Sequence, residues 1–149
     1  MITGVRTALI CERVEMANGF PSFITVADNT LAARTRPGII SFQLVLQVDL
    51  DKEATAVQIR VAANNYIQGV NFNVPSGQTF VTLVPVFMVP VTEDGDLFVE
   101  VSDESGKPPH RFPWALYFDE HARALTPDEI VQFAKEADAA AQAKGIPMN

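Results

Sequence analysis

Hydrophobic and polar residues alternate through residues 40–50 of this 149-residue chain. The even positions are apolar and the odd positions are polar, with Val45 as the exception. Successive side chains of a strand point to opposite faces, so this alternation predicts an antiparallel strand with one buried and one solvent-facing side. Similar patterns separated by turn signals predict further strands. The segments predicted as strands are 6–16, 21–28, 40–50, 57–62, 66–74, 80–91, 97–101 and 110–118.

Short strands at this spacing, without helices between them, favour a single antiparallel β-sandwich of seven to nine strands in an immunoglobulin-like arrangement. Residues 29–38 are expected to form a polar, basic connection that contains Arg34 and Arg36. The apolar faces of the strands supply the predicted core. Its members are Leu44, Leu46, Val48, Val57, Ile59, Val70, Phe72, Leu97, Val99, Phe112, Trp114 and Leu116.

One helix is predicted at 127–144. Thr126 and Glu129 occupy the N-cap and third helical positions, which is the pattern of a capping box, and Gly145 and Pro147 are typical of a helix end. Apolar residues then recur at helical spacing and form a narrow stripe. The stripe consists of Ile130, Phe133, Ala134, Ala137 and Ala141.

The pattern therefore divides the chain into a β-domain at 1–125 and a helix with its tail at 126–149. Because the helix stripe is rich in alanine, it is expected to pack lightly, either on its own domain or on a neighbouring subunit.

Composition narrows the expected partners and compartment. The formal net charge of −7 argues against nucleic acid or an anionic membrane as the main partner. A single cysteine excludes an intrachain disulfide, and neither a secretion signal nor a membrane-spanning apolar run is visible. The sequence predicts a cytoplasmic, soluble protein without a cofactor.

The sequence contains no recognisable catalytic motif, and we predict that the protein is not an enzyme. The competing hypothesis is a hydrolase or lyase whose active site is assembled from residues scattered along the sequence. The candidate catalytic residues are Cys11, His110, Asp119 and His121. Cys11 lies within an apolar segment, which is typical of an inert core cysteine.

A calcium-dependent binding module is a third hypothesis, because clustered loop carboxylates can bind calcium in β-sandwich domains. Two acidic turns are candidates, although acidic turns are commonly just solvated hairpins. The carboxylates concerned are Asp49, Asp51 and Glu53 at one turn, and Asp94 and Asp96 at another.

The segment 81–91 differs from the other strands because both of its alternating faces are apolar. Pro85 and Pro90 cannot donate ladder hydrogen bonds, so an edge or bulged strand is expected. Its second face is either covered by the C-terminal helix or exposed as a protein interface. We predict a non-enzymatic interaction or structural subunit, working through a protein partner or self-association. The predicted interface residues are Leu83, Val86, Phe87, Met88, Val89, Ile130 and Phe133.

Segments 8–14 and 23–29 resemble the first two strands of a family of small bacterial β-sandwich proteins of unknown function, and 95–103 resembles its penultimate hairpin strand. The resemblance spans roughly residues 7–118 and leaves the C-terminal helix outside. It implies an immunoglobulin-like sandwich and supplies no activity, ligand or catalytic residue.

Overall fold

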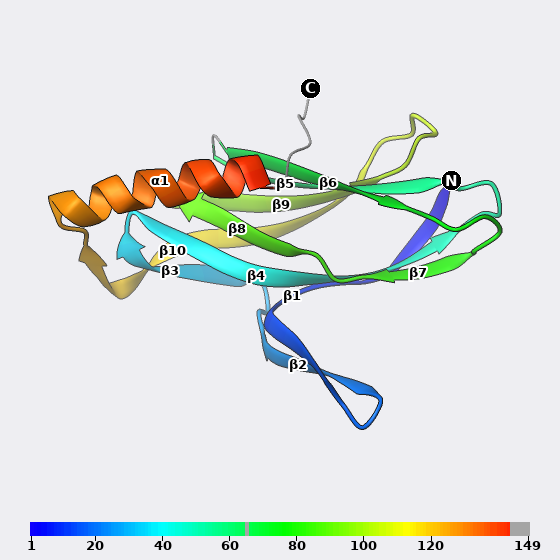
Figure 1. Ribbon diagram of the computed structural model, residues 1–149, viewed down its shortest axis with the longest axis horizontal. Coiled ribbons are helices and arrows are strands. Elements are labelled where there is room, and N and C mark those ends of the chain that lie inside the picture. The colour runs from blue at the N-terminus through cyan, green and yellow to red at the C-terminus, as the bar shows by residue number, and fades with distance from the viewer. Residues whose placement is uncertain (65, 144–149) are drawn as a thin grey trace.

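A computed structural model describes residues 1–64 and 66–143 of the chain. Within them the chain forms ten strands followed by one helix (Figure 1). The elements are β1 (Ile2–Ala17), β2 (Phe20–Val26), β3 (Thr30–Arg36), β4 (Gly38–Leu50), β5 (Ala56–Ala63), β6 (Tyr66–Asn73), β7 (Phe80–Leu83), β8 (Val86–Val91), β9 (Gly95–Ser102), β10 (His110–Ala124) and α1 (Pro127–Ala143).

The strands form two five-stranded sheets. In the first sheet β2 pairs with β1 and β1 with β4, while β7 and β8 both pair with β4. The second sheet has the order β3-β10-β9-β5-β6. All pairings are antiparallel except that between β3 and β10. The protein is therefore mainly β, with a C-terminal helix, as the sequence pattern predicts.

Both sheets contribute side chains to one hydrophobic core. The even positions of β4 from Phe42 to Leu50 are buried, and Val45 on the opposite face is buried as well. Of the predicted core residues, all are buried except Val70, Phe72 and Phe112, which are half-buried and pack against the core. The alternation thus identified the core-facing side of these strands correctly.

The predicted strand number and the uniform antiparallel pairing are corrected by the structure. The expected connection at 29–38 contains β3, which joins β10 as a parallel edge strand. The segment 80–91 is split into β7 and β8 around Pro85, whose carbonyl accepts a hydrogen bond from the Leu44 N–H. Within residues 1–64 and 66–143, both halves pair only with β4, which agrees with the edge position expected from the prolines.

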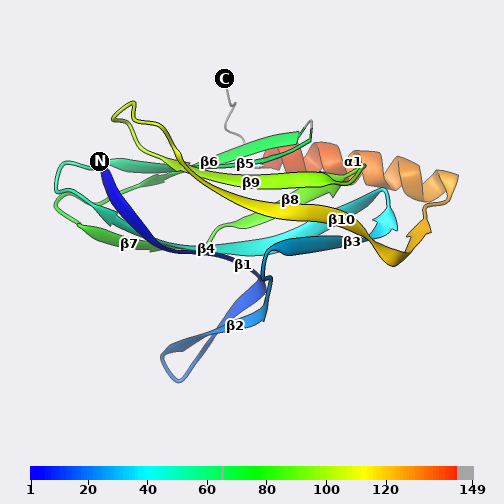
Figure 2. The same cartoon turned by 180° about the vertical axis from the view of Figure 1, so that it is seen from behind.

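Helix α1 begins at Pro127, as the sequence predicts. Its capping box is formed, because the Glu129 N–H donates to Thr126 Oγ1 and the Thr126 N–H donates to a Glu129 carboxylate oxygen. The helix packs on β8 and β4, at one end of the molecule (Figures 1 and 2). The Ala141 side chain and the predicted stop at Gly145 and Pro147 lie outside the described residues.

Among the residues described, no helix combines the length and apolar character needed to cross a membrane.

Candidate functional site

A two-stranded hairpin projects from the body of the molecule (Figures 1 and 2). The pairing of β1 with β4 ends where Cys11 lies opposite Gln43, while its pairing with β2 continues from Cys11 opposite Val26 to Ala17 opposite Phe20. We call residues 12–26 the arm. Beyond its base, the arm is a ribbon of two strands without a third strand beside it in the part of the chain that the structure describes.

The sequence forms the arm through its turn. Asn18 and Gly19 both have positive φ angles, of 53° and 78°, which is the requirement of a two-residue hairpin turn whose twist matches the flanking strands. Near the base, the Arg13 guanidinium lies 2.7 Å from a Glu15 carboxylate oxygen and 3.7 Å from a Glu12 carboxylate oxygen. Among the described residues, the charged side chains of the arm therefore form salt bridges with one another and with no residue of the body.

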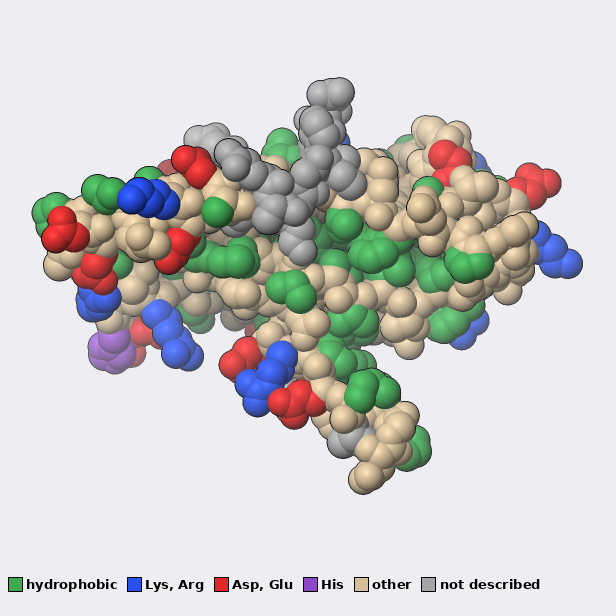
Figure 3. Space-filling view, viewed as in Figure 1, with side chains coloured by type: hydrophobic (Ala, Val, Ile, Leu, Met, Phe, Trp, Pro, Cys, Tyr) green, Lys and Arg blue, Asp and Glu red, His purple; other side chains and the backbone are tan. Residues whose placement is uncertain are grey.

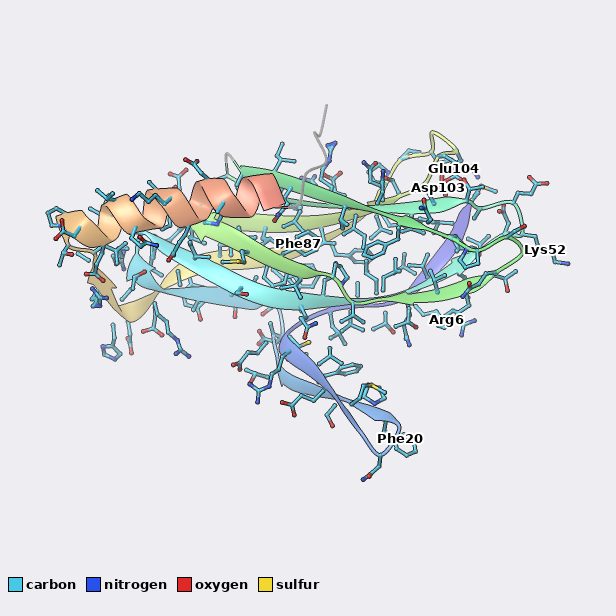
Figure 4. The ribbon with its side chains drawn as sticks, in the orientation of Figure 1. Arg6, Phe20, Lys52, Phe87, Asp103 and Glu104 are labelled. Atoms are coloured by element: carbon cyan, nitrogen blue, oxygen red, sulfur yellow. The ribbon has the colours of Figure 1, made fainter. Side chains whose placement is uncertain are left out.

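Large apolar side chains are exposed along the arm. Met16 is 69% exposed and Phe20 is 74% exposed, and Phe23 and Val26 are exposed too. Figure 3 shows the charges near the base and hydrophobic side chains farther out, and Figure 4 places Phe20 at the far end. Single exposed apolar residues are ordinary on protein surfaces, but a group of them on one projecting element is typical of a contact site.

A groove lies at the base of the arm, with a volume of about 540 Å³. It opens where β1 leaves β4, and β3 forms its other side. The large apolar residues of its lining are Ile10, Leu31, Ile39, Ile40 and Phe42, and its other lining residues include Cys11, Glu12, Thr25, Ala32, Arg34 and Ser41. The arm and the groove are therefore adjoining parts of one surface, because Glu12 and Thr25 belong to both.

Gln43 accepts two hydrogen bonds that hold the base of the arm. The Val14 N–H donates to Gln43 Oε1 at 2.6 Å, and the Cys11 thiol donates to the Gln43 carbonyl oxygen at 3.7 Å. Burial raises the pKa of the Cys11 thiol, which keeps it protonated and unreactive at neutral pH. Cys11 is therefore a packing residue at this site.

The predicted interface residues of 81–91 separate onto two faces. Phe87 and Val89 are 0% exposed and belong to the core, so the expectation that they meet a partner is corrected. They point inward because they lie opposite Phe42 and Ile40 on the core side of β4. Leu83 is half-buried against the same core.

Val86 and Met88 remain exposed on the outer face of β8, together with Val84. Val86 lies opposite Gln43, which on its other side lies opposite Cys11 at the base of the arm. The exposed part of β8 is therefore two strand spacings, roughly 10 Å, from the arm on the same sheet.

The helix contributes less to this surface than the sequence suggested. Ile130 is exposed, whereas Phe133 is half-buried and lines a smaller depression of about 330 Å³ between the helix and the start of β4. Helix α1 thus covers the end of β8 and leaves the outer face at Val86 and Met88 open. The helix thus accounts for part of β8, and the role of its exposed part as an interface stays a prediction.

Most carboxylates of the acidic turns already form hydrogen bonds or salt bridges with other groups of the protein. Asp49 receives the Arg6 guanidinium at 2.8 Å, Asp51 receives the N-terminal ammonium group at 2.5 Å, and Asp94 accepts the Phe118 N–H at 3.1 Å. Glu53 and Asp96 are exposed. The ammonium group beside Asp51 lowers the pKa of that carboxyl. Within the described residues, no three His, Cys, Asp or Glu side chains are grouped closely enough to hold a metal ion.

Of the scattered candidates for catalysis, the structure brings Asp119 and His121 together in a depression that Arg34 also lines, and it keeps His110 and Cys11 apart from them. His110 and His121 lie near opposite ends of β10. The Asp119 carboxylate accepts the backbone N–H of His121, and Cys11 is buried in the first sheet. This arrangement gives no shared pocket to the four residues.

Sequence reasoning predicted strands at 6–16 and 21–28 but missed the arm as a surface. The available signal was the run of large apolar residues on both sides of Asn18-Gly19, namely Met16, Phe20 and Phe23. Alternation alone could not show that β1 leaves β4 after Cys11, because alternation reports the two faces of a strand and not the strands beside it.

Comparison with known proteins finds no matching family model and no matching curated protein.

Proposed function

We propose that this protein is a non-enzymatic interaction or structural subunit that binds other protein chains through exposed apolar strand surface. The observation that carries the proposal is the arm, which holds Met16, Phe20 and Phe23 exposed on a projecting ribbon. An isolated two-stranded hairpin is marginally stable in water, so covering the arm with a partner would order it and bury its aromatic side chains.

The outer face of β8 supports the same proposal as a secondary contact area. Val86 and Met88 lie on the same sheet as the arm base, so a partner seated along the arm would reach them without a second interface. Burying each such side chain would contribute about 1.5–3 kcal/mol before the costs of association. We place the main contact on the arm and the accessory contact on β8.

At the level of fold family, we propose that the two sheets form an immunoglobulin-like sandwich, consistent with the resemblance to small bacterial β-sandwich proteins. Two five-stranded sheets that share one core support this proposal. An immunoglobulin-like fold would have to include the parallel pairing of β3 with β10.

The proposal is tested by photo-cross-linking in the cells that express the protein. A photoreactive phenylalanine analogue replaces Phe20 on the arm, and in a matched control the same analogue replaces Gln78, an exposed residue in the loop before β7. We expect a discrete covalent adduct with a protein chain at Phe20 and none at Gln78. Mass spectrometry of the adduct then identifies whether the captured chain is another copy or a different protein.

A second variant distinguishes an adduct that forms through specific binding of the arm from one that forms through random collision. With the analogue kept at position 20, Phe23→Glu should abolish the adduct, because a charge on the arm opposes burial of its apolar side chains. Equal labelling at Phe20 and Gln78, or labelling at Phe20 that survives Phe23→Glu, would refute an interaction role for the arm.

A further inference from the structure

Strand β4 has a free backbone edge at the groove, where β1 leaves it to form the arm (Figure 1). The β1–β4 ladder ends with Cys11 opposite Gln43. Within residues 1–64 and 66–143, no strand pairs with that side of β4 over residues 39–42, whereas β8 pairs with the other side. An edge of this kind offers unpaired backbone N–H and C=O groups along about 13 Å of extended chain.

The hydrogen bonds of β4 show which residues offer their backbone groups at this edge. The Leu44 N–H donates to the carbonyl oxygen of Pro85, which precedes β8. Backbone groups of successive strand residues point to opposite neighbours, so those of Phe42 also point to β8. By the same alternation, the N–H and C=O groups of Ser41 and Ile39 point to the free edge.

The β8 residues opposite Ser41 and Ile39 agree with this direction. Met88 lies opposite Ser41, and its carbonyl oxygen accepts the Tyr66 hydroxyl of β6 at 3.0 Å, so it points away from β4. Pro90 lies opposite Ile39 and has no N–H to donate. Pairing with β8 therefore leaves the backbone groups of Ser41 and Ile39 free for a strand on the other side.

Apolar side chains lie beside this edge and form the floor of the groove, which belongs to the margin of the core. These side chains are Ile10, Leu31, Ile40 and Phe42. A strand added next to β4 would direct every second side chain towards them. The groove lining also holds Glu12 and Arg34, one acidic and one basic residue, so charge does not select the occupant. The backbone edge and the apolar floor select it instead.

We propose that this edge binds an extended peptide segment of a partner protein, which adds to the first sheet as a strand beside residues 39–42. The segment continues the row that β1 forms beside residues 43–50 of the same strand. Its backbone bonds to Ser41 and Ile39, and its alternate apolar side chains lie on the groove floor. This mode of recognition selects an extended conformation with an apolar residue at every second position. It goes beyond the proposed function, which concerns the arm and the outer face of β8.

A phage-displayed library of random linear peptides, selected on the whole chain, supplies the probe for a test. The selection should enrich peptides in which apolar residues alternate with polar ones. One enriched peptide is synthesised, and calorimetry measures its dissociation constant. The same peptide with alternate backbone nitrogens methylated, in the register that faces β4, should bind at least about tenfold more weakly, because it has lost donors to the edge.

Two proline variants test the edge from the side of the protein. Ser41→Pro removes an N–H that points to the free edge and no bond to β8, and it should weaken peptide binding at least about tenfold. Met88→Pro is the matched control, because the backbone of Met88 points away from β4, and it should leave the dissociation constant unchanged. The arm variant Phe20→Glu/Phe23→Glu should also bind the peptide as the wild type does.

Amide hydrogen exchange on the wild type tests the same edge without a variant that has to fold. The Ser41 N–H should exchange rapidly in the free protein and at least about tenfold more slowly when the peptide is bound. The Phe42 N–H, which points to β8, should exchange slowly in both states.

The proposal is overturned by a selection that enriches no peptide, by equal binding to Ser41→Pro and wild type, or by binding that the arm variant abolishes. A Ser41 amide that is already protected without peptide would show that the chain itself or a second copy fills the edge, and would overturn it too. The proposed function fails by a different result, the absence of a specific adduct at Phe20, since that experiment tests the arm and peptide binding tests the groove.

Discussion

Thr25 shows how a single residue departs from the surrounding strand. Its φ angle of 54° lies in the left-handed region, which a β-branched residue seldom adopts, and it lies at the end of β2 beside the groove. The conformation costs about 1–2 kcal/mol in an L-residue with a Cβ atom. The strain lies where the arm bends away from the body, so the arm's direction depends on this backbone position.

We predict that Thr25→Gly stabilises the protein by up to about 1 kcal/mol, because relief of the left-handed strain exceeds the entropic cost of glycine. Urea denaturation monitored by fluorescence measures the change in the free energy of unfolding. Thr82→Gly is the matched control in β7, where φ is not positive, and it should destabilise by about 0.5–1 kcal/mol. Equal losses for the two variants would contradict a strained Thr25.

Tyr66 joins the two sheets along one edge of the molecule. Its hydroxyl oxygen in β6 lies 2.6 Å from Gln68 Oε1 and 3.0 Å from the Met88 carbonyl oxygen in β8. Gln68 is itself buried. Burial raises the pKa of Tyr66 to about 12, compared with its ordinary value of 10.0.

The direction of the Tyr66 shift predicts a loss of stability at alkaline pH. Since the folded-state pKa is higher than the unfolded one, the stabilisation is fully present below pH 10.0 and is lost as the pH rises towards about 12. Tyr66→Phe should cost about 1–3 kcal/mol at neutral pH, because it removes a hydrogen bond to a buried acceptor. Melting temperatures at pH 8 to 12 for both proteins measure this, and a constant difference across that range would contradict it.

At the scale of elements, the start of helix α1 is held to β10 by one carboxylate. Glu129 receives the Arg123 guanidinium through two contacts of 2.6 and 2.8 Å, and it also accepts the Thr126 N–H at 3.2 Å. The bond from Arg123 and the N–H of Thr126 lower the pKa of Glu129 from 4.5 to about 2. One side chain thus fixes the helix start and its junction with the preceding strand.

The lowered pKa of Glu129 predicts that its contribution to the stability of the fold disappears in acid. Because the folded-state pKa of Glu129 is depressed, the stabilisation is present above pH 4.5 and is lost as the pH falls towards about 2. The melting temperature of Glu129→Gln should therefore lie below that of the wild type at neutral pH and approach it near pH 2. Glu136→Gln, the same change elsewhere on the helix, should show no such convergence, and convergence in both variants would refute the assignment.

The segment 80–91 shows that a neighbouring strand, and not the local pattern alone, sets which face of a strand is buried. Its run of apolar residues predicts one strand with two apolar faces. The Pro85 break divides it, and pairing with β4 turns Phe87 and Val89 inward, opposite Phe42 and Ile40. The prolines allowed the edge position to be predicted, but the inward face is set by the strand beside it.

At the scale of the whole molecule, the shared core separates structural residues from surface residues of the same strand. The Phe87 ring lies with its centroid 5.9 Å from that of Phe42, and Phe87 belongs to the core cluster that both sheets build. The neighbouring Met88 side chain points to the outer face. Their substitutions should therefore differ greatly in effect.

We predict that Phe87→Ala destabilises the protein by about 3–5 kcal/mol, because it removes a buried ring and leaves a cavity. Met88→Ala should change the free energy of unfolding by about 0.5 kcal/mol or less, as is usual for a surface substitution. Urea denaturation of both variants and the wild type is the measurement. A small effect of Phe87→Ala would mean that Phe87 is not part of the core.

The sequence by itself determined the elements whose signals are local. The alternation at 40–50 predicted β4 and its core-facing side, and Thr126 with Glu129 predicted the start of α1. The turn signals separated the segments 6–16 and 21–28, which form the two strands of the arm. These predictions succeeded because strand faces, capping and turn geometry depend on neighbouring residues within one short segment.

Only the tertiary structure decided which segments meet and which remain uncovered. It recruited the polar segment of β3 to a parallel pairing with β10, and it ended the β1–β4 ladder at Cys11, so that the arm projects and the groove opens beside it. Pairing between distant segments is settled by competition for one shared core. A strand's own residues do not specify where it will leave the strand beside it.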